Sequence, residues 1–475
     1  MMRTKRWDID MTSGPILGSL LRFSIPLVLT NLLQMLYNAT DMIVVGLSSE
    51  PDAVGAIGTT SSFVTLIVCL FIGLSVGANV VVARHIGAKD EARVSRALHT
   101  STVVALVLGV VGGAVGVLIA RPVMVLMGNE GRLLELSVLY TRLYFAALPF
   151  HSLSNYAIAL HRAKGDTKTP LVVLTVAGVA NVLLNLFFVQ VCNMSVEGVA
   201  IATAVAAALS AVVLYANLMR ENGPCRFSFG RLCLDRAEMK QILLVGIPSG
   251  VQGALFALSN MMIQSSIIQV NNAMCDPGAA YQPVVKGNAA VANLEGFVYT
   301  AVNAVTQATI SFTSQNLGAR KFDRIKRVMI TSYALDFGIA VVLSALLIVF
   351  NRPLLALYGV YPDATDAIAQ LAYDSAMTRI MWTILPYGLI SAMEIGSGVM
   401  RGLGKTLSST TVCLLGACFL RVLWTKTVFR AFGTLESVFL VYPISWVITG
   451  VALFLVAAVV LRKMRREQLG TIHEL

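Results

Sequence analysis

The stretch that decides the fold is RFSIPLVLTNLLQMLYNATDMIVVG, residues 22–46. Asp41 is the one charged residue between Arg22 and Glu50. The stretch is long enough to cross a bilayer as a helix. At about 100° per residue its polar side chains share one face, which consists of Thr30, Asn31, Gln34, Asn38 and Asp41. That face is expected to point at protein or water.

A carboxylate in such a segment is costly. A charged side chain at the centre of a membrane helix costs about 2.5–3.5 kcal/mol on insertion scales, and such residues usually mark the path of an ion, a proton or a substrate. The sequence therefore predicts that Asp41 is the coupling residue of a transporter. The alternative is a structural acid that is satisfied by neighbouring amides.

The whole chain has the composition of a polytopic membrane protein. Of its 475 residues, 56% are hydrophobic and only 13% are charged, which lies far outside the range of soluble proteins. The net charge is +11, but the basic residues lie in short clusters between apolar runs. This placement is typical of membrane topology and not of phosphate recognition, so no nucleic-acid partner is expected.

The N-terminus and the cysteines add two expectations. The first ten residues lead into a full-length span without a small-residue cleavage site, so the first helix is expected to be retained. The seven cysteines show no metal-binding spacing. Cys192 and Cys275 are both predicted near the outer side of the membrane, so a disulfide between them is conceivable.

Apolar runs between basic breaks predict twelve membrane-spanning helices. They lie at residues 22–46, 54–83, 97–120, 137–160, 170–192, 196–219, 241–270, 286–316, 328–350, 375–403, 407–430 and 437–462. Of the 36 Lys and Arg residues, 27 fall in the termini and in every second connection. Because basic residues accumulate on the cytoplasmic side, both termini are predicted to be cytoplasmic.

The chain also repeats itself. Residues 86–89 (IGAK) match residues 317–320 (LGAR) at an offset of 231, and about forty residues align there without a gap. Each half contains six spans and so enters the membrane in the same orientation. The predicted fold is an all-α polytopic membrane protein, with twelve helices in two pseudo-twofold-related six-helix bundles around a central cleft. Its domains are an N-lobe (1–219), a cytoplasmic linker (220–240) and a C-lobe (241–475).

Polar groups present in only one half are the better functional candidates, because a repeat preserves the scaffold. Asp41 aligns with Ile263, so the acid is specific to the first half. Asn181 and Asn185 are four residues apart and share a helix face. At ~1.5 Å per residue, Asp41, Asn185 and Thr203 lie at a common depth of roughly 8–11 Å below the outer surface.

These side chains predict a coupling-cation site made of Asp41, Asn181, Asn185 and Thr203. One carboxylate, two amide oxygens and a hydroxyl could supply ligands for a hard cation such as Na⁺, and they could equally control the protonation of Asp41. The alternative is interhelical hydrogen bonding at about 0.6 kcal/mol per contact.

Other polar groups are candidates for a substrate cleft. They are Gln34, Tyr37, Asn38, Asn155, Asn260, Glu295 and Glu394. Glu295 and Glu394 either line a cleft that attracts cations or form salt bridges with Arg421 or Lys426. Asp336 is expected near the cytoplasmic end of its helix in a structural role, and Arg379 is expected to belong to the scaffold.

At this point the sequence resembles the multidrug and toxic compound extrusion (MATE) transporters, in particular the bacterial DinF-like and MepA-like members. The resemblance covers nearly the whole chain through these motifs: SIP (24–26), LYNATDM (36–42), LHRAKGDTKTP (160–170), QNLGAR (315–320) and MRGLGKT (400–406). It implies that Asp41 is the family's span 1 carboxylate and that Pro26 is associated with helix bending. It also implies that Asn181 and Thr203 belong to a polar cluster of the N-lobe. Asn185 departs from the pattern, because many DinF-like members have aspartate there.

The resemblance implies a function as well. Such proteins are secondary antiporters, which expel amphipathic organic cations in exchange for inward H⁺ or Na⁺ by rocker-type alternating access. A multi-pass protein of the bacterial plasma membrane is expected, with lipid around it, no cofactor and a monomeric state. One alternative is a lipid-linked-saccharide flippase of the same broad superfamily, which would typically have fourteen spans and a cationic cleft. A membrane enzyme such as a prenyl-phosphate transferase is disfavoured, because no paired acidic motif of the DDxxD kind is present.

Overall fold

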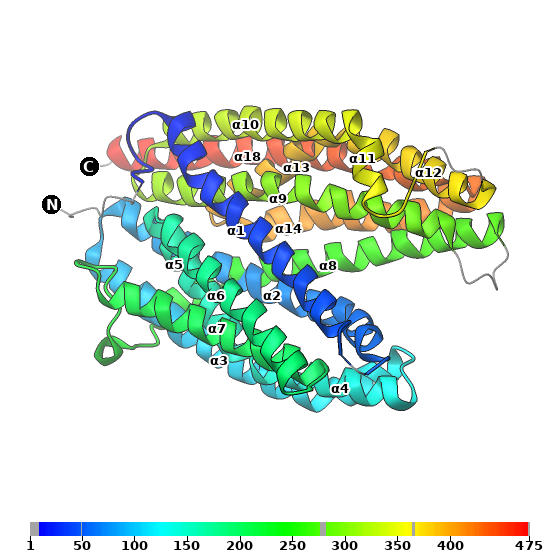
Figure 1. The fold of residues 1–475 in the computed structure, drawn as a ribbon. Coiled ribbons are helices and arrows are strands. Elements are labelled where there is room, and N and C mark those ends of the chain that lie inside the picture. The colour runs from blue at the N-terminus through cyan, green and yellow to red at the C-terminus, as the bar shows by residue number, and fades with distance from the viewer. Residues whose placement is uncertain (1–8, 49, 276–281, 363–365, 474–475) are drawn as a thin grey trace. The chain divides into compact units, whose positions relative to one another are not determined.

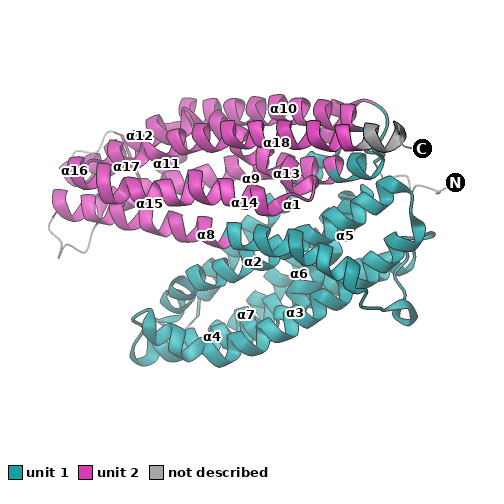
Figure 2. Ribbon diagram, turned by 180° about the vertical axis from the view of Figure 1, so that it is seen from behind, with its two compact units in different colours: residues 1–14, 21–253, 314–321 teal, residues 15–20, 254–313, 322–475 magenta. Residues whose placement is uncertain are grey.

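The structure is a computed structural model that describes residues 9–48, 50–275, 282–362 and 366–473. These residues form helices and connecting segments, with no strand among them (Figure 1). The chain divides into two compact units (Figure 2): unit 1 comprises residues 1–14, 21–253 and 314–321, and unit 2 comprises residues 15–20, 254–313 and 322–475. The lobes and linker derived from the sequence remain a prediction.

Unit 1 is built from seven long helices and the first part of an eighth. They are α1 (Ile16–Val45), which enters the unit at Leu21, α2 (Ala53–Ala88), α3 (Glu91–Leu126), α4 (Gly131–Ala146), α5 (Leu148–Lys164), α6 (Lys168–Leu186), α7 (Val196–Met219) and α8 (Arg236–Met274), which leaves it after Gly253. A π-helical turn, η1 (Phe187–Val191), continues α6, and a 3-10 turn, η2 (Phe229–Arg231), precedes α8.

Unit 2 contains the first residues of α1, the rest of α8 and the helices that follow it, except the end of α9 (Pro283–Gly318) from Ser314 onward, which belongs to unit 1. They are α9 (Pro283–Gly318), α10 (Phe322–Val349), α11 (Asn351–Ala356), α12 (Ala367–Arg379), α13 (Ile390–Gly402), α14 (Thr406–Cys413), α15 (Leu420–Trp424), α16 (Arg430–Phe432), α17 (Leu435–Phe439) and α18 (Val441–His473). Four short turns lie between them: η3 (Ile380–Ile384), η4 (Tyr387–Leu389), η5 (Leu414–Phe419) and η6 (Thr425–Phe429).

All twelve predicted spans fall on helices. Among the described residues, nine helical runs are each long and apolar enough to cross a membrane, and a tenth is obtained when α4 and α5, which are bent by 48°, are taken together. The two remaining spans fall on α9, which is rich in Asn, Ser and Thr, and on the broken run from α12 to α13. Polar residues in α9 and the break between α12 and α13 explain why neither span passes a test of helix length and hydropathy.

Helix α2 packs directly on the part of α8 that belongs to unit 1. A Cβ on Gly73 would lie 2.3 Å from the Cα of Gly250, and a Cβ on Gly77 would lie 2.1 Å from the carbonyl oxygen of Ile242. Two backbones can approach this closely only where a side chain is absent. The small-residue spacing of Gly73 and Gly77 thus marks a real helix contact.

The internal repeat is visible in the backbone. Lys89 and Arg320, which the repeat pairs with each other, have positive φ angles of 58° and 55°. Their amides donate to the carbonyls of Ile86 and Leu317, each at 3.0 Å. Because the left-handed conformation is uncommon for residues other than glycine, its occurrence at both paired positions supports the duplication.

The cysteines and Pro26 were singled out in the sequence. Cys192 and Cys275 are both free, so the structure contains no disulfide between them. Helix α1 runs without interruption through Pro26, whose ring removes one backbone donor. The Thr30 hydroxyl donates to the Pro26 carbonyl at 2.8 Å. The role of Pro26 in bending stays a prediction.

Candidate functional site

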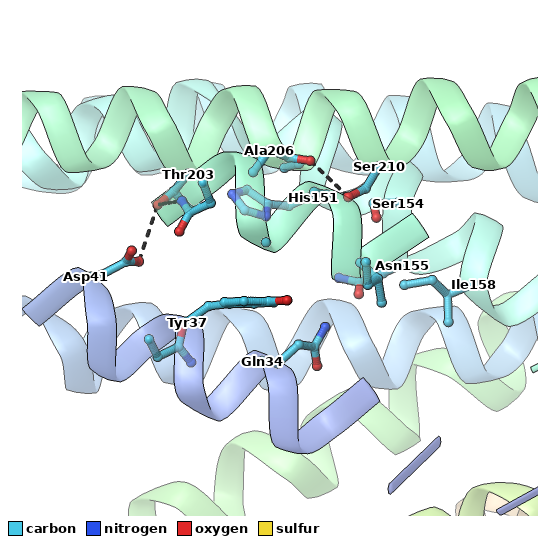
Figure 3. Close-up of a pocket in the computed structure, with 16 residues that line it drawn as sticks. Gln34, Tyr37, Asp41, His151, Ser154, Asn155, Ile158, Thr203, Ala206 and Ser210 are labelled. Carbon is cyan, nitrogen blue, oxygen red and sulfur yellow. Dashed lines mark hydrogen bonds between the residues drawn. The ribbon is translucent and has the colours of Figure 1, made fainter. Parts of the chain in front are cut away.

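A polar cavity of about 170 Å³ lies within unit 1, among α1, α5, α6 and α7. Figure 3 shows Gln34, Tyr37 and Asp41 projecting into it from α1, with Thr203 and Asn155 on the other side. Asn38 and Asn181 also line this cavity. Seven of the residues singled out in the sequence therefore share one space, although they come from four helices.

The predicted coupling residues form one hydrogen-bonded cluster at the Asp41 end of the cavity. Asn185 Nδ2 donates to Asp41 Oδ1 at 2.5 Å, and Thr203 Oγ1 donates to Asp41 Oδ2 at 3.5 Å. Asn185 Nδ2 also donates to Asn181 Oδ1 at 3.2 Å, and Asn181 Nδ2 donates to Thr203 Oγ1 at 3.4 Å. The i, i+4 spacing of the two asparagines on α6 turns both side chains toward α1.

The electrostatics of this cluster favour a cation. Its four side chains carry one negative charge and no positive charge, and both hydrogen-bond donors to Asp41 are neutral. Asp41 also lies in the last turns of α1, which ends at Val45, where the backbone carbonyl ends disfavour an anion and favour a cation. A proton or a bound metal cation would remove this uncompensated charge.

The side-chain oxygen of Asn185 supports the fit of this cluster to a cation. Asn185 is fully buried, and its Oδ1 has no hydrogen-bond partner among the described residues. A buried amide oxygen without a donor is unusual, and it lies on the side chain that already contacts Asp41. Together with the carboxylate, the Asn181 oxygen and the Thr203 hydroxyl, it makes an all-oxygen set of the kind that hard cations take.

Tyr37 is positioned by the absence of a side chain on α6. A Cβ on Gly178 would lie 1.8 Å from the Tyr37 ring, so the ring occupies the space that any larger residue would fill. The Tyr37 hydroxyl donates to the Thr175 carbonyl at 3.3 Å. The contact fixes α1 against α6 and places an aromatic face in the cavity, next to the cluster.

The three cleft candidates from the second half lie in unit 2 and do not join this cavity. Asn260 Oδ1 accepts from Arg421 Nη1 at 3.1 Å. Glu295 forms an ion pair with Arg379 Nη2 at 2.8 Å. Glu394 lies on α13 and is partly exposed.

The alternative in which Glu295 forms a salt bridge with Arg421 or Lys426 is therefore wrong. Its partner is Arg379, whose guanidinium also lies 5.5 Å from the ring centre of Phe439. Arg421 instead places its guanidinium 4.4 Å from the ring centre of Tyr442. The reason is helix rotation: the side of α9 that carries Glu295 faces α12, which a count of charges in spans does not determine.

Sequence reasoning missed one titratable residue in the cavity, His151 on α5 (Figure 3). Its ring stacks on Tyr144 with centroids 5.0 Å apart, and its Nε2 is buried without a partner among the described residues. A usable signal was present, since His151 falls inside a predicted span, and ionisable residues within spans are functional candidates by default. Ser154 and Ser210 line the cavity as well.

Comparison with known proteins gives consistent results. A sequence model of the MatE family matches residues 26–187 and 280–426. The chain is 27% identical over 399 residues to the "Probable multidrug resistance protein YoeA" of Bacillus subtilis, covering 82% of each chain. It is 21% identical to the "Multidrug export protein MepA" of Staphylococcus haemolyticus, covering 90% of this chain and 94% of the relative.

The fold is also that of solved structures. The crystal structure of MATE in complex with MaL6 superposes with a TM-score of 0.87, covering 98% of this chain and 100% of the other at 20% sequence identity. Likeness at this identity speaks for the fold alone. It confirms the predicted architecture of twelve membrane-spanning helices.

Proposed function

The chain belongs to the MATE family of multidrug transporters, and on that premise we propose that it expels amphipathic organic cations in exchange for inward H⁺ or Na⁺. Members of this family are multi-pass membrane transporters of small molecules and not enzymes. The single observation that carries the coupling proposal is the Asp41 carboxylate, held by neutral donors at the end of a polar cavity. The protein is proposed to act as a monomer in the bacterial plasma membrane, with both termini cytoplasmic.

The cavity is suited to the coupling ion more than to a whole drug. Drug-sized ligands usually occupy pockets of about 300–1,000 Å³, whereas this cavity measures about 170 Å³. A cation that engages Asp41 therefore belongs to the described conformation, and an organic cation needs a wider one. When the space widens, the Tyr37 ring offers a face to the organic cation, and the amides of Gln34, Asn38 and Asn155 offer hydrogen bonds.

Coupling then follows from competition between the two cations. If the ion stabilises one conformation of a rocker-type alternating-access cycle and the organic cation stabilises the other, each weakens the binding of the other by the same factor at equilibrium. Asp41 is the group through which the ion acts, because its charge is the one that the cluster leaves uncompensated. Asn181, Asn185 and Thr203 orient the carboxylate and supply oxygen atoms.

The charges of the cavity disfavour the flippase alternative. Among the described residues that line it, Asp41 and His151 are the groups that can carry charge, and neither Lys nor Arg is present. A pyrophosphate needs cationic donors such as guanidinium groups. The cavity has the opposite character.

Efflux of a fluorescent organic cation such as ethidium tests the proposal. Purified protein is reconstituted into vesicles, and a Na⁺ gradient and a pH gradient are imposed in separate experiments. One of the two gradients is expected to drive ethidium against its concentration gradient, and Asp41→Asn is expected to abolish this uphill movement. Transport that neither gradient energises, or uphill transport by Asp41→Asn at the wild-type level, would refute the proposal.

A further inference from the structure

A second buried acid lies in unit 2, outside the function proposed above. Asp336 has no exposed surface, and neither of its carboxylate oxygens has a partner at hydrogen-bond geometry among the described residues. The sequence placed it near the cytoplasmic end of its helix, which is wrong, because α10 extends from Phe322 to Val349 and Asp336 lies in its middle. A buried ionised carboxylate without a partner is strongly disfavoured.

The neighbours of Asp336 come from α13. The Ser391 hydroxyl and the Glu394 carboxyl both act on it electrostatically. Ser391 is buried, and its Oγ also has no partner at hydrogen-bond geometry among the described residues. The carboxyl groups of Asp336 and Glu394 therefore lie within electrostatic reach of each other where α10 packs on α13, together with the hydroxyl group of Ser391.

The positive charge available to this pair neutralises only one of its members. Arg401 lies two turns after Glu394 on α13, and its positive charge stabilises the ionised form of Glu394. Two other elements packed on α10 add no free positive charge. The first, η4, contributes the phenol of Tyr387, which lies near Glu394. The second, η3, directly follows Arg379, but the guanidinium of Arg379 is paired with Glu295. Arg401 can balance Glu394, and Asp336 is left without a counter-charge.

The repeat shows that the scaffold does not require this acid. At the repeat offsets, Asp336 corresponds to Ala105, and Ser391 corresponds to Ser152. In unit 1 the Ser152 hydroxyl donates to the Ala105 carbonyl at 2.7 Å, so the equivalent pair of helices, α3 and α5, packs without a carboxyl group. Glu394 takes the place of Asn155 in the same way. Both acids are therefore present in the second half alone.

We propose that Asp336 and Glu394 form a proton-binding site of unit 2, in which Asp336 holds the proton and Glu394 exchanges it. The proton goes onto a carboxylate oxygen of Asp336, and the neutral acid that results can donate to the hydroxyl oxygen of Ser391. Glu394 is partly exposed, so it provides the contact with the surroundings that Asp336 lacks. The ligand is a proton because Asp336 is buried without a counter-charge, and the negative charge of Glu394 nearby further favours the neutral form of Asp336.

Infrared spectroscopy of the full-length protein tests this site, because a protonated carboxyl group has a C=O stretch that an ionised one lacks. The protein is prepared with carbon-13 at the aspartate carboxyl, in an Asp41→Asn background that removes the aspartate of the unit 1 cavity. At neutral pH a carboxylic acid band that shifts with the label is expected. The band is expected to disappear in Asp336→Asn and to remain in Asp323→Asn, a control at an exposed acid on the same helix.

Two results would overturn the proposal. The first is the absence of any label-sensitive carboxylic acid band, which needs no substitution at Asp336 and so holds even if Asp336→Asn fails to fold. The second is a band that persists in Asp336→Asn. Because Asn has the shape of a neutral Asp, we also expect Asp336→Asn to keep the thermal midpoint of unfolding close to that of the background protein, and a large drop would count against a neutral Asp336. None of these readouts depends on transport, so the proposed function can fail while this site stands.

Discussion

Replacing Asp41 by Asn should separate binding from coupling. The two side chains have the same shape, and the hydrogen bond from Asn185 changes from charge-assisted to neutral, a loss of about 1 kcal/mol. The fold should therefore persist, whereas the single negative charge of the cluster is removed. One proton exchanged for one monovalent organic cation moves no net charge, so a pH gradient of about one unit supports at most a tenfold substrate gradient, or about 1.4 kcal/mol.

The assay is the steady-state substrate gradient in vesicles that hold a fixed pH gradient. Wild-type protein should approach a tenfold gradient, Asp41→Asn should give none, and Asp52→Asn, an exposed acid beyond the end of α1, should behave as wild type. For a Na⁺-coupled protein the same values should follow from a tenfold Na⁺ gradient. A gradient in Asp41→Asn equal to that of wild type would refute the assignment of Asp41, even if the protein folds normally.

Three further predictions concern the frame of the site. Gly178→Ala should displace the Tyr37 ring, lower efflux severalfold and lower the midpoint of thermal unfolding. Adding Tyr37→Ala should restore that midpoint, because the methyl group of the new alanine then has room. A double variant that stays as unstable as Gly178→Ala would contradict a clash between residue 178 and the Tyr37 ring. Gly73→Ala should destabilise the protein by about 1–3 kcal/mol, because it meets the Gly250 backbone, which cannot rotate away; a thermal-unfolding midpoint equal to wild type would contradict this. Burial raises the pKa of Asp166, but the hydrogen bond from His161 and the charges of His161 and Lys164 outweigh it and hold the pKa well below its usual range. The stabilisation should therefore be present above the unfolded pKa, near 4, and be lost as the pH falls through the folded value; at neutral pH Asp166→Ala should cost about 3–5 kcal/mol by chemical unfolding, and an unchanged unfolding free energy would contradict it.

The sequence was sufficient to predict that Asp41, Asn181, Asn185 and Thr203 meet, because two independent constraints converge on this cluster. Helical spacing places Asn181 and Asn185 on one face, and counting residues from the predicted outer ends places Asp41, Asn185 and Thr203 at one depth. Side chains at the same depth on neighbouring helices meet when their faces are turned toward each other. Polar faces turn inward because lipid excludes them, so both conditions could be inferred without coordinates.

The same reasoning failed where rotation and neighbourhood decide the contact. Glu295 faces Arg379 because of the rotation of α9, and no depth argument distinguishes this partner from Arg421. His151 lines the cavity from the first turn of α5, just after the 48° bend between α4 and α5 that follows Ala146. Hydropathy showed one continuous span there. The position of Asp336 was misjudged because α10 begins six residues before the apolar run that marks its span.

The two halves place their acids at positions that the repeat does not relate, and this difference assigns them different tasks. Asp41 replaces the apolar Ile263, lies near the end of its helix and lines a cavity, so a cation can reach it and leave it during each transport cycle. Asp336 replaces Ala105, lies in mid-helix and is fully enclosed. Its carboxylate has no exposed surface of its own, so in the site proposed for unit 2 a proton reaches it through Glu394. In the function proposed above, coupling to substrate belongs to the accessible acid, Asp41, and the proton held by the enclosed Asp336 is a separate one.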